Sequence, residues 1–412
     1  MSNRRVVITG AGAISPLGND WPSVKEKLLS YTNAVRVMEE WRDIEGLRTA
    51  VGCPAAPFAL DPARFNRKSM RSMGRVALLA VLAADKALSE AGITEDIVRS
   101  GRLGIAAGSS AGAPGAIGDV ARLILNRSTV GMTANTYVKM MAHTAPVNIG
   151  VFFGIKGRII TTSSACTSSS QGIGYAYETI LSGRQDYMLA GGSEELDASD
   201  AAIFDTLFAT STEYNREPKS TPRPFDARRD GLVIGEGGCM LVLEELECAK
   251  RRGAHILAEI VGFGTNSDGT HITSPQSGQM AQAMRLALED AGLEPGQIGY
   301  INAHGTATDA GDRAESHAME AVFGANTPTS TLKSYMGHTL GACGALEAWM
   351  TIMMMREGWF APTINLTEVA PDCAKLDYIT GVAREIRTDH VMSNNFAFGG
   401  INTSLIFKRY EE

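Results

Sequence analysis

A cysteine within a run of small and hydroxyl side chains is the first candidate for chemistry. Cys166 lies in TTSSACTSSSQGIG, residues 161–174, after an apolar segment and before a glycine-containing stretch with helical spacing. At a strand-to-helix junction, free backbone N–H groups and the helix dipole favour a thiolate, and the same amides can hold an oxyanion. An unpaired cysteine in an α/β protein is, however, usually a packed small side chain. The segment alone leaves packing and nucleophilic catalysis equally open.

Two histidines in glycine-rich segments extend this candidate site. His304 lies in NAHGTATDAGD, and Lys333 and His338 lie in KSYMGHTLGACGALEA. Histidine in such loops is typical of functional sites, although a lone histidine is more often structural. Zinc held by Cys166 and both histidines is a weaker alternative, because the sequence has no closely spaced ligand pair. We interpret the cysteine and the two histidines as a catalytic set.

Three further segments have both a structural and a functional interpretation. SNNFAFGGINTSLIF (393–407) is either a turn and a strand or a mobile glycine loop that carries Phe398 over a site. RFNRKSMRSMGR (64–75) has basic residues three and four positions apart, which on a helix would share one face. This basic surface is either solvated or a dock for an acidic partner. GAGAIS (10–15) lacks the third glycine of a dinucleotide fingerprint, so we expect a tight turn after the first strand.

These residues require a frame of alternating strands and helices. Strands are expected within the segments RRVVITG, RLGIAAGSS, GRIITTSSAC and DYMLAGGSEE, each followed by a turn or a loop. Helices are expected over 74–93 and 168–183. CMLVLEELECAKRRG (239–253) predicts a strand that runs into a helix, and WMTIMMM (349–355) predicts a buried helix. The alternation predicts an α/β sheet covered on both faces.

An internal echo predicts two related halves. VLAADKALSEAGI (81–93) is similar to MRLALEDAGL (284–293), and each follows a strand with glycines, VVITGAG and AEIVGFGTNSDG. We therefore expect an N-terminal half over 1–255, which carries the cysteine, and a C-terminal half over 256–412, which carries both histidines.

Composition narrows the class of protein. The 412 residues are 44% hydrophobic and 20% charged, which is typical of a globular protein with two domains or one duplicated domain. The net charge of −7 gives no support for binding nucleic acid. Six scattered cysteines indicate reduced thiols and a cytoplasmic protein. The sequence contains no apolar run of 18 residues, so we expect no transmembrane helix.

Five motifs in order resemble the β-ketoacyl-(acyl-carrier-protein) synthases of the thiolase superfamily, over essentially the whole chain. The motifs are SSACTSSSQGIG (163–174), PFDARRDGLVIGEGG (224–238), NAHGTATDAGD (302–312), KSYMGHTLGACGALEA (333–348) and SNNFAFGG (393–400). The Cys-His-His set is similar to the elongating type I and type II enzymes. The resemblance implies a thiolase-like fold of two α/β halves in αβαβα layers. It also implies decarboxylative condensation of an acyl chain with malonyl-acyl carrier protein, in fatty-acid or polyene and polyketide synthesis.

The resemblance also implies a role for individual residues. Cys166 is then the acyl-accepting nucleophile, His304 and His338 bind the malonyl thioester carbonyl, and Lys333 supports them. The backbone N–H groups of Cys166 and Phe398 form the oxyanion hole, and Phe398 gates the pocket. The implied substrate-binding residues are Thr306, Thr308, Phe396, Gly399 and Ala111, and the implied carrier-protein docking residues are Lys68 and Arg71. A structural Na⁺ or K⁺ is implied at Asn302, Glu347, Ser393 and Asn394. The chemistry requires no cofactor beyond the phosphopantetheine of the carrier protein.

Departures from the family pattern raise further expectations. Ala397 replaces a frequent glycine in the gate and should restrict positive φ. Small residues in SSAGAPGA (109–116) suggest an enlarged acyl channel, suited to polyene, aryl or polyketide-like chains. A non-catalytic chain-length-factor-like subunit would usually lack Cys166, and a degradative thiolase would carry a second cysteine in the last motif. Either a homodimer or a heterodimer with a homologous chain-length-factor-like subunit is expected, and the sequence does not distinguish them.

Overall fold

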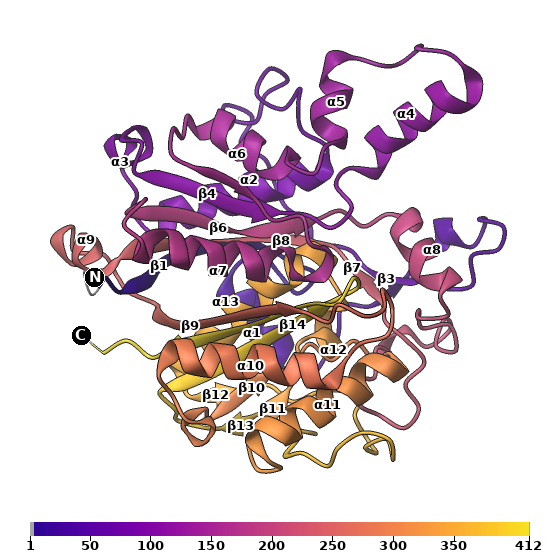
Figure 1. Cartoon of the computed structure of the whole chain (residues 1–412). Helices are drawn as coiled ribbons and strands as arrows, with labels where there is room; N and C mark the ends of the chain where they lie inside the picture. Colours follow the sequence, from indigo (N-terminus) through magenta and orange to yellow (C-terminus); the bar gives the residue numbers. More distant parts are fainter. Residues whose placement is uncertain (1–3, 412) are drawn as a thin grey trace.

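The chain forms five layers of alternating helices and sheet. A computed structural model describes residues 4–411. Helices α2 (Arg75–Glu90) and α6 (Thr144–Phe153) cover one outer face, and α10 (Ser277–Ala291) and α11 (Asp309–Phe323) cover the other (Figure 1). Helices α7 (Ser168–Leu181) and α13 (Cys343–Glu357) lie between the two halves of the sheet. The predicted αβαβα arrangement is confirmed.

A ten-stranded sheet runs through both halves of the chain. In spatial order its strands are β11 (Thr329–Ser330), β10 (Tyr300–Asn302), β14 (His390–Ala397), β15 (Ile401–Lys408), β9 (Ala258–Ser267), β1 (Val6–Ile14), β8 (Gly237–Glu245), β6 (Tyr187–Glu194), β4 (Leu103–Gly108) and β5 (Ile159–Thr161). A three-stranded sheet consists of β2 (Arg36–Val37), β3 (Val51–Cys53) and β7 (Ile234–Gly235). A two-stranded sheet consists of β12 (Trp359–Phe360) and β13 (Arg384–Glu385).

The two halves of the large sheet repeat one topology. Counted along the chain, each half has the spatial strand order 3-2-4-5-1. In each half, the fifth strand lies between the first and the fourth strands and is antiparallel to both. The second strand lies between the fourth and the third strands and is parallel to both. Strands β1 and β9 join the halves through a short antiparallel pairing between Val6 and Ile260. The division into units at residue 255 remains our proposal.

Matching glycines explain the sequence echo between the halves. A Cβ atom on Gly10 or Gly12 of β1 would overlap the backbone of α2 at Ala87. In the other half, a Cβ atom on Gly262 or Gly264 of β9 would overlap the backbone of α10 at Ala287. The glycines therefore let each helix lie directly on its strand. The expected turn at 10–15 is wrong, because these residues continue strand β1.

The middle layer consists of two helices that begin next to chemistry-bearing residues. Helix α7 (Ser168–Leu181) follows Cys166, and α13 (Cys343–Glu357) follows His338. Both are almost wholly buried because each packs on the other and on a sheet. The buried helix predicted at 349–355 is confirmed, as are the helices predicted at 74–93 and 168–183.

The remaining helices lie at the edges of this frame. They are α1 (Trp21–Leu29), α3 (Glu95–Arg99), α4 (Pro114–Asn126), α5 (Ala134–Met140), α8 (Ala198–Thr206), α9 (Leu246–Arg251) and α12 (Lys333–Met336). Short 3-10 turns cover Glu39–Trp41, Ala165–Thr167, Pro218–Ser220, Pro295–Gln297 and Leu340–Ala342. The basic residues of 64–75 do not share a helix face, because residues 62–72 form successive turns and α2 starts only at Arg75. Within residues 4–411, no helix is long and apolar enough to cross a membrane.

Candidate active site

Cys166 lies where strand β5 leads into helix α7. The chain turns through the 3-10 segment Ala165–Thr167, and Ala165 takes a positive φ of 52° just before the cysteine. The hydroxyls of Thr167 and Ser168 bond back to carbonyls three residues earlier. The small and hydroxyl residues therefore build the turn that holds Cys166 at the start of α7, as the sequence predicted.

His304 follows strand β10 and is held by two buried side chains. Its backbone N–H and that of Gly305 each donate to the Glu315 carboxylate at 2.7 Å. Its ring Nδ1 lies 3.1 Å from Lys333 Nζ. Because a protonated amine has no lone pair, Lys333 donates and Nδ1 accepts, so the ring proton of a neutral His304 is on Nε2.

His338 has the same tautomer for a different reason. The backbone N–H of Leu340 donates to its Nδ1 at 3.3 Å, which again leaves the proton on Nε2. The two imidazoles are nearly perpendicular, with ring centroids 5.0 Å apart. The Cys166 sulfur and one nitrogen of each ring all lie within 4.8 Å of one another. The site thus combines one thiol with two neutral N–H donors.

The charge of Lys333 is balanced inside the protein. Lys333 forms a buried ion pair with Glu347, and the other Glu347 oxygen accepts from Asn395 Nδ2 at 2.8 Å. Although burial opposes it, the Glu347 carboxylate raises the pKa of Lys333, so the amine stays protonated. Burial lowers the pKa of both His304 and His338 well below the usual value, and the charge of Lys333 lowers them further. Both rings are therefore neutral at neutral pH.

The thiol of Cys166 faces two backbone N–H groups. Burial raises the pKa of Cys166 to about 11, while Lys333 and the backbone N–H groups of Phe398 and Cys166 oppose that rise. The N–H groups therefore favour the thiolate, as expected, but burial outweighs them and the net shift favours the thiol. The two amides nevertheless converge at the sulfur, which is the arrangement that an oxyanion hole requires.

The Phe398 loop joins β14 to β15 across the site. Ala397 ends β14 in extended backbone paired with Ile401, and the left-handed residues are Gly399 and Gly400, with φ of 89° and 71°. Ala397 therefore lies outside the positive-φ region, which alanine was expected to restrict. The Phe398 ring packs on Phe204 of α8, with centroids 5.1 Å apart.

A cavity of about 330 Å³ opens onto Cys166. It is lined by seven of the ten predicted catalytic and substrate-binding residues, namely Cys166, His304, His338, Thr306, Thr308, Phe396 and Phe398. Lys333 does not line it but contacts His304. The hydroxyls of Thr306 and Thr308 lie 2.9 Å apart on its wall. Gly399 and Ala111 do not line it: the Gly399 amide bonds to Ile272, and the Ala111 amide bonds to the Glu194 carboxylate.

Lys68 and Arg71 are exposed on the turns that precede α2. Of the basic residues in the segment 64–75, Arg64 pairs with Asp85 and Arg75 pairs with Glu236. Arg67, Lys68 and Arg71 have no ion-pair partner among the described residues. The segment thus presents free positive charge without being a helix.

The four residues predicted to hold a monovalent cation are buried together behind Lys333. Asn302 and Ser393 are register partners on β10 and β14, with Asn302 Nδ2 donating to the Ser393 hydroxyl at 3.3 Å. Among the described residues, the Oδ1 atom of Asn302 and the amide nitrogen of Asn394 are buried without a partner. The Asn302 oxygen and the Glu347 carboxylate are ligand types that suit a small cation, whereas the Asn394 nitrogen can only donate a hydrogen bond.

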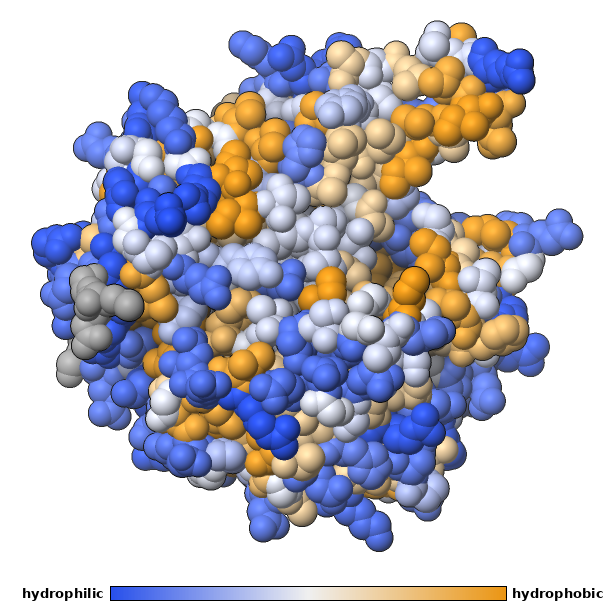
Figure 2. All heavy atoms as spheres, viewed as in Figure 1, coloured by the Kyte–Doolittle hydropathy of each residue, from blue (hydrophilic) through white to orange (hydrophobic). Residues whose placement is uncertain are grey.

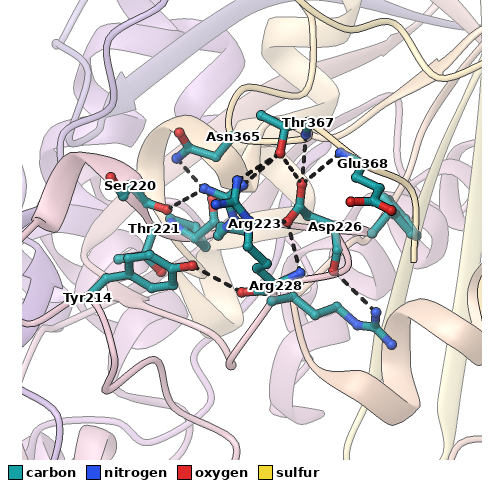
Figure 3. Close-up of polar contacts among 12 residues, drawn as sticks. Tyr214, Ser220, Thr221, Arg223, Asp226, Arg228, Asn365, Thr367 and Glu368 are labelled. Carbon is teal, nitrogen blue, oxygen red and sulfur yellow. Dashed lines mark hydrogen bonds and ion pairs between the residues drawn. The ribbon is translucent and has the colours of Figure 1, made fainter. Parts of the chain in front are cut away.

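A polar network fixes the loop that faces the two threonines. Figure 3 shows Asp226, whose carboxylate accepts from Arg223 Nε at 3.1 Å and from the backbone N–H of Thr367 at 2.7 Å. Further donors to it are Thr367 Oγ1, the Glu368 amide and the Arg228 amide. Beyond this network, the Gly231 amide donates to Ala307 at 3.0 Å. The network therefore positions residues 224–231 against the loop of Thr306 and Thr308.

Sequence reasoning missed several groups that shape the site. Asn395 reaches both Glu347 and His304, Glu315 anchors the His304 loop, and the Cys343 thiol donates to the Cys166 carbonyl at 3.2 Å. Phe204, on α8, contacts the gate. Asn395 and Cys343 lie inside quoted motifs, but nothing in residue type separated them from packing residues.

Comparison with known proteins agrees with this geometry. Family models described as the N-terminal and C-terminal domains of β-ketoacyl synthase match residues 3–249 and 257–367. The chain is 39% identical to 3-oxoacyl-(acyl-carrier-protein) synthase 1 of Haemophilus influenzae, with 99% of each chain covered. A crystal structure of a β-ketoacyl synthase from Burkholderia phymatum is 57% identical with a TM-score of 0.97, over 99% of this chain and 100% of that one. The ishigamide ketosynthase/chain length factor is 33% identical with a TM-score of 0.90, over the same shares.

The chain belongs to the β-ketoacyl synthase family. It is an acyltransferase with a thiolase-like fold, as the motifs predicted.

Proposed function

We propose that the chain condenses an acyl group, held on Cys166, with a malonyl group on acyl carrier protein to give β-ketoacyl-acyl carrier protein. The carrying observation is one thiol that faces two backbone N–H groups and lies beside two neutral Nε2–H donors. The relative named 3-oxoacyl-(acyl-carrier-protein) synthase 1 supports the substrate class.

The first half-reaction transfers the acyl group to Cys166. The sulfur attacks the acyl thioester carbonyl, whose oxygen becomes negative and accepts from the amides of Cys166 and Phe398. The tetrahedral adduct collapses and expels the phosphopantetheine thiolate, which takes up the proton lost by the Cys166 thiol. Lys333 and the two amides favour the transient thiolate against the cost of burial.

The second half-reaction uses the two histidines. His304 and His338 donate their Nε2–H groups to the malonyl thioester oxygen, which becomes an enolate oxygen as carbon dioxide leaves. The enolate carbon then attacks the acyl carbonyl on Cys166, forms the new carbon–carbon bond and releases the cysteine sulfur. Each preorganised donor of this kind typically contributes about 3 kcal/mol to lowering the barrier.

The remaining predicted residues position the substrates. Thr306 and Thr308 would hold the pantetheine arm in the cavity, and Phe398 would move when the acyl chain enters beside Phe204. Lys68 and Arg71 would meet the acidic carrier protein. Asn302, Glu347, Ser393 and Asn394 would hold a Na⁺ or K⁺ that fixes the strands behind Lys333.

An apolar surface supports assembly with a second, homologous chain. Figure 2 shows hydrophobic surface over the projecting α4 and α5 segment, where Ile124, Leu125 and Val130 are exposed by 72%, 79% and 87%. Patches of this kind usually mark protein interfaces. We propose a homodimer or a heterodimer with a chain-length-factor-like subunit, and a reducing compartment such as the cytoplasm, since all six cysteines are free.

Condensation by the purified chain tests this function. The protein is mixed with acyl and malonyl acyl carrier protein, alone and with a homologous subunit, and the β-ketoacyl product is measured. We expect product with wild type, none with Cys166→Ala, and product with Cys343→Ala, which removes the neighbouring buried thiol. Full condensation by Cys166→Ala would contradict the proposal. Activity of the chain alone favours the homodimer, and activity only with the second subunit favours the heterodimer.

A further inference from the structure

A buried carboxylate near the site has no role in the proposed reaction. Asp200 lies in the first turn of α8 and is only 3% exposed. Among residues 4–411 its Oδ2 atom has no hydrogen-bond partner, although the backbone of Asp197 donates to the carboxyl group. The buried carboxylates of Glu194, Glu315 and Asp226 each accept several hydrogen bonds. A buried carboxyl group with one unpaired oxygen is costly to fold, so its presence calls for a partner that arrives later.

Helix α8 places Asp200 one turn away from a residue that contacts the gate. Asp200 and Phe204 are four residues apart on α8 and so share one helix face. Phe204 lines the cavity of Cys166 and packs on Phe398. Phe204, Phe398 and Leu340 belong to one hydrophobic cluster. Asp200 does not itself line the cavity, but it lies one helical turn from Phe204, whose apolar cluster includes the gate residue Phe398.

The surroundings of Asp200 connect it to the nucleophile from a second side. Glu194, whose charge acts on Asp200, accepts from the amides of Ala111 and Gly341. Two residues after Gly341, the Cys343 thiol donates to the Cys166 carbonyl. Asp200 is therefore close to Glu194, the carboxylate that holds the start of the segment 109–116, in which the sequence suggested an unusual acyl channel.

We propose that Asp200 selects acyl chains that carry a hydrogen-bonding group, such as a hydroxyl or a carbonyl, at the end far from the thioester. The inference rests on the proposed function, since it assumes that Cys166 carries the acyl chain. A saturated chain would press a methyl group against the carboxyl and leave it unpaired. Sites that hydrogen-bond a substrate reject the analogue that lacks the group, because the buried partner is then unsatisfied.

The protonation state of Asp200 suits such recognition. Burial, helped by the charges of Glu194, Asp197 and Glu195, raises the pKa of Asp200 to about 8. At neutral pH the side chain is therefore mostly a neutral acid. A neutral carboxylic acid both donates and accepts, so it can bind either a hydroxyl or a carbonyl.

Matched pairs of thioesters test the inference on the full chain. The probes are hexanoyl to dodecanoyl thioesters of N-acetylcysteamine, each with its ω-hydroxy counterpart, and the readout is the rate of Cys166 acylation by intact mass. We expect wild type to prefer the hydroxylated chain at its best length by roughly tenfold or more, the effect of one buried hydrogen bond. Asp200→Leu should reverse that preference, Asp200→Asn should keep part of it, and the exposed control Ser199→Ala should keep all of it.

Three results would overturn the inference. Equal rates for both members of every pair in wild type, or an unchanged preference in Asp200→Leu, would remove the recognition role while leaving the proposed function intact. Acylation of Cys166 by no chain would remove both. We expect Asp200→Leu to melt at a higher temperature than wild type, because an unpaired buried polar atom is removed. A lower melting temperature would show that the carboxylate stabilises the fold and would contradict the inference.

Discussion

The buried pair of Lys333 and Glu347 gives the sharpest energetic prediction. Both side chains are almost fully buried, and Lys333 also donates to His304. Lys333→Met would leave Glu347 without a cation, with the neutral side-chain amides of Asn395, at 2.8 Å, and Asn302 as its donors. Removing one member of a buried ion pair typically costs 3–5 kcal/mol. Because the Asn395 bond remains, we expect about 3 kcal/mol of lost stability.

The double variant separates stability from chemistry. Lys333→Met with Glu347→Gln removes both charges, so we expect it to recover at least half of the stability lost in Lys333→Met. It should not recover activity, because no cation then fixes the His304 tautomer. With one donor mispositioned, release of carbon dioxide from malonyl carrier protein should fall about a hundredfold in both variants.

Thermal unfolding and the pH profile of carbon dioxide release measure these effects. The charge of Lys333 lowers the pKa of His304, so its removal should move the acidic limb of the profile to higher pH. If Lys333→Met were as stable as wild type, the buried ion pair as described would be refuted. It would also be refuted if the double variant lost as much free energy of unfolding as the two single variants together. Recovery of activity in the double variant would refute the positioning role of Lys333.

Three more predictions follow from the same geometry. His304→Ala and His338→Ala should each slow carbon dioxide release by about a hundredfold or more, with Cys166 acylation less affected; equal losses in both half-reactions would contradict their assignment. Asp226→Ala should lower the free energy of unfolding by about 3 kcal/mol, since it strands the buried Arg223, and an unchanged melting temperature would contradict this. Asp200→Asn should be stabilising by an amount that grows from pH 5 to pH 8, because a folded-state pKa raised to about 8 costs wild type stability as pH rises; a pH-independent difference in melting temperature would contradict it.

Much of the frame was predictable because local patterns and tertiary packing agree. The glycines of β1 and β9 and the alanines of α2 and α10 recur because the same strand–helix contact occurs twice. The buried stretch in α13 was evident from its lack of polar residues. The segment 64–75 misled because basic residues three and four apart satisfy helical spacing, although the chain there forms turns.

The site was predictable in part. Glycine-rich loops around His304 and His338 indicated chemistry, but the proton positions depend on Lys333 and on the Leu340 amide, which only the fold brings close. The pKa of Cys166 could not be foreseen, since burial competes with the N–H groups and its extent is tertiary. Asp200 was unremarked because one aspartate in a helix usually faces solvent.

The most direct test of the account is the identity of the acylated residue. The purified chain is incubated with acyl carrier protein that bears an acyl group, digested, and analysed by peptide mass spectrometry. The account predicts one acyl mass on the peptide that contains Cys166, none in Cys166→Ala, and an unmodified Cys343 throughout. Acylation at Cys343 or elsewhere, or an adduct that persists in Cys166→Ala, would contradict the central claim.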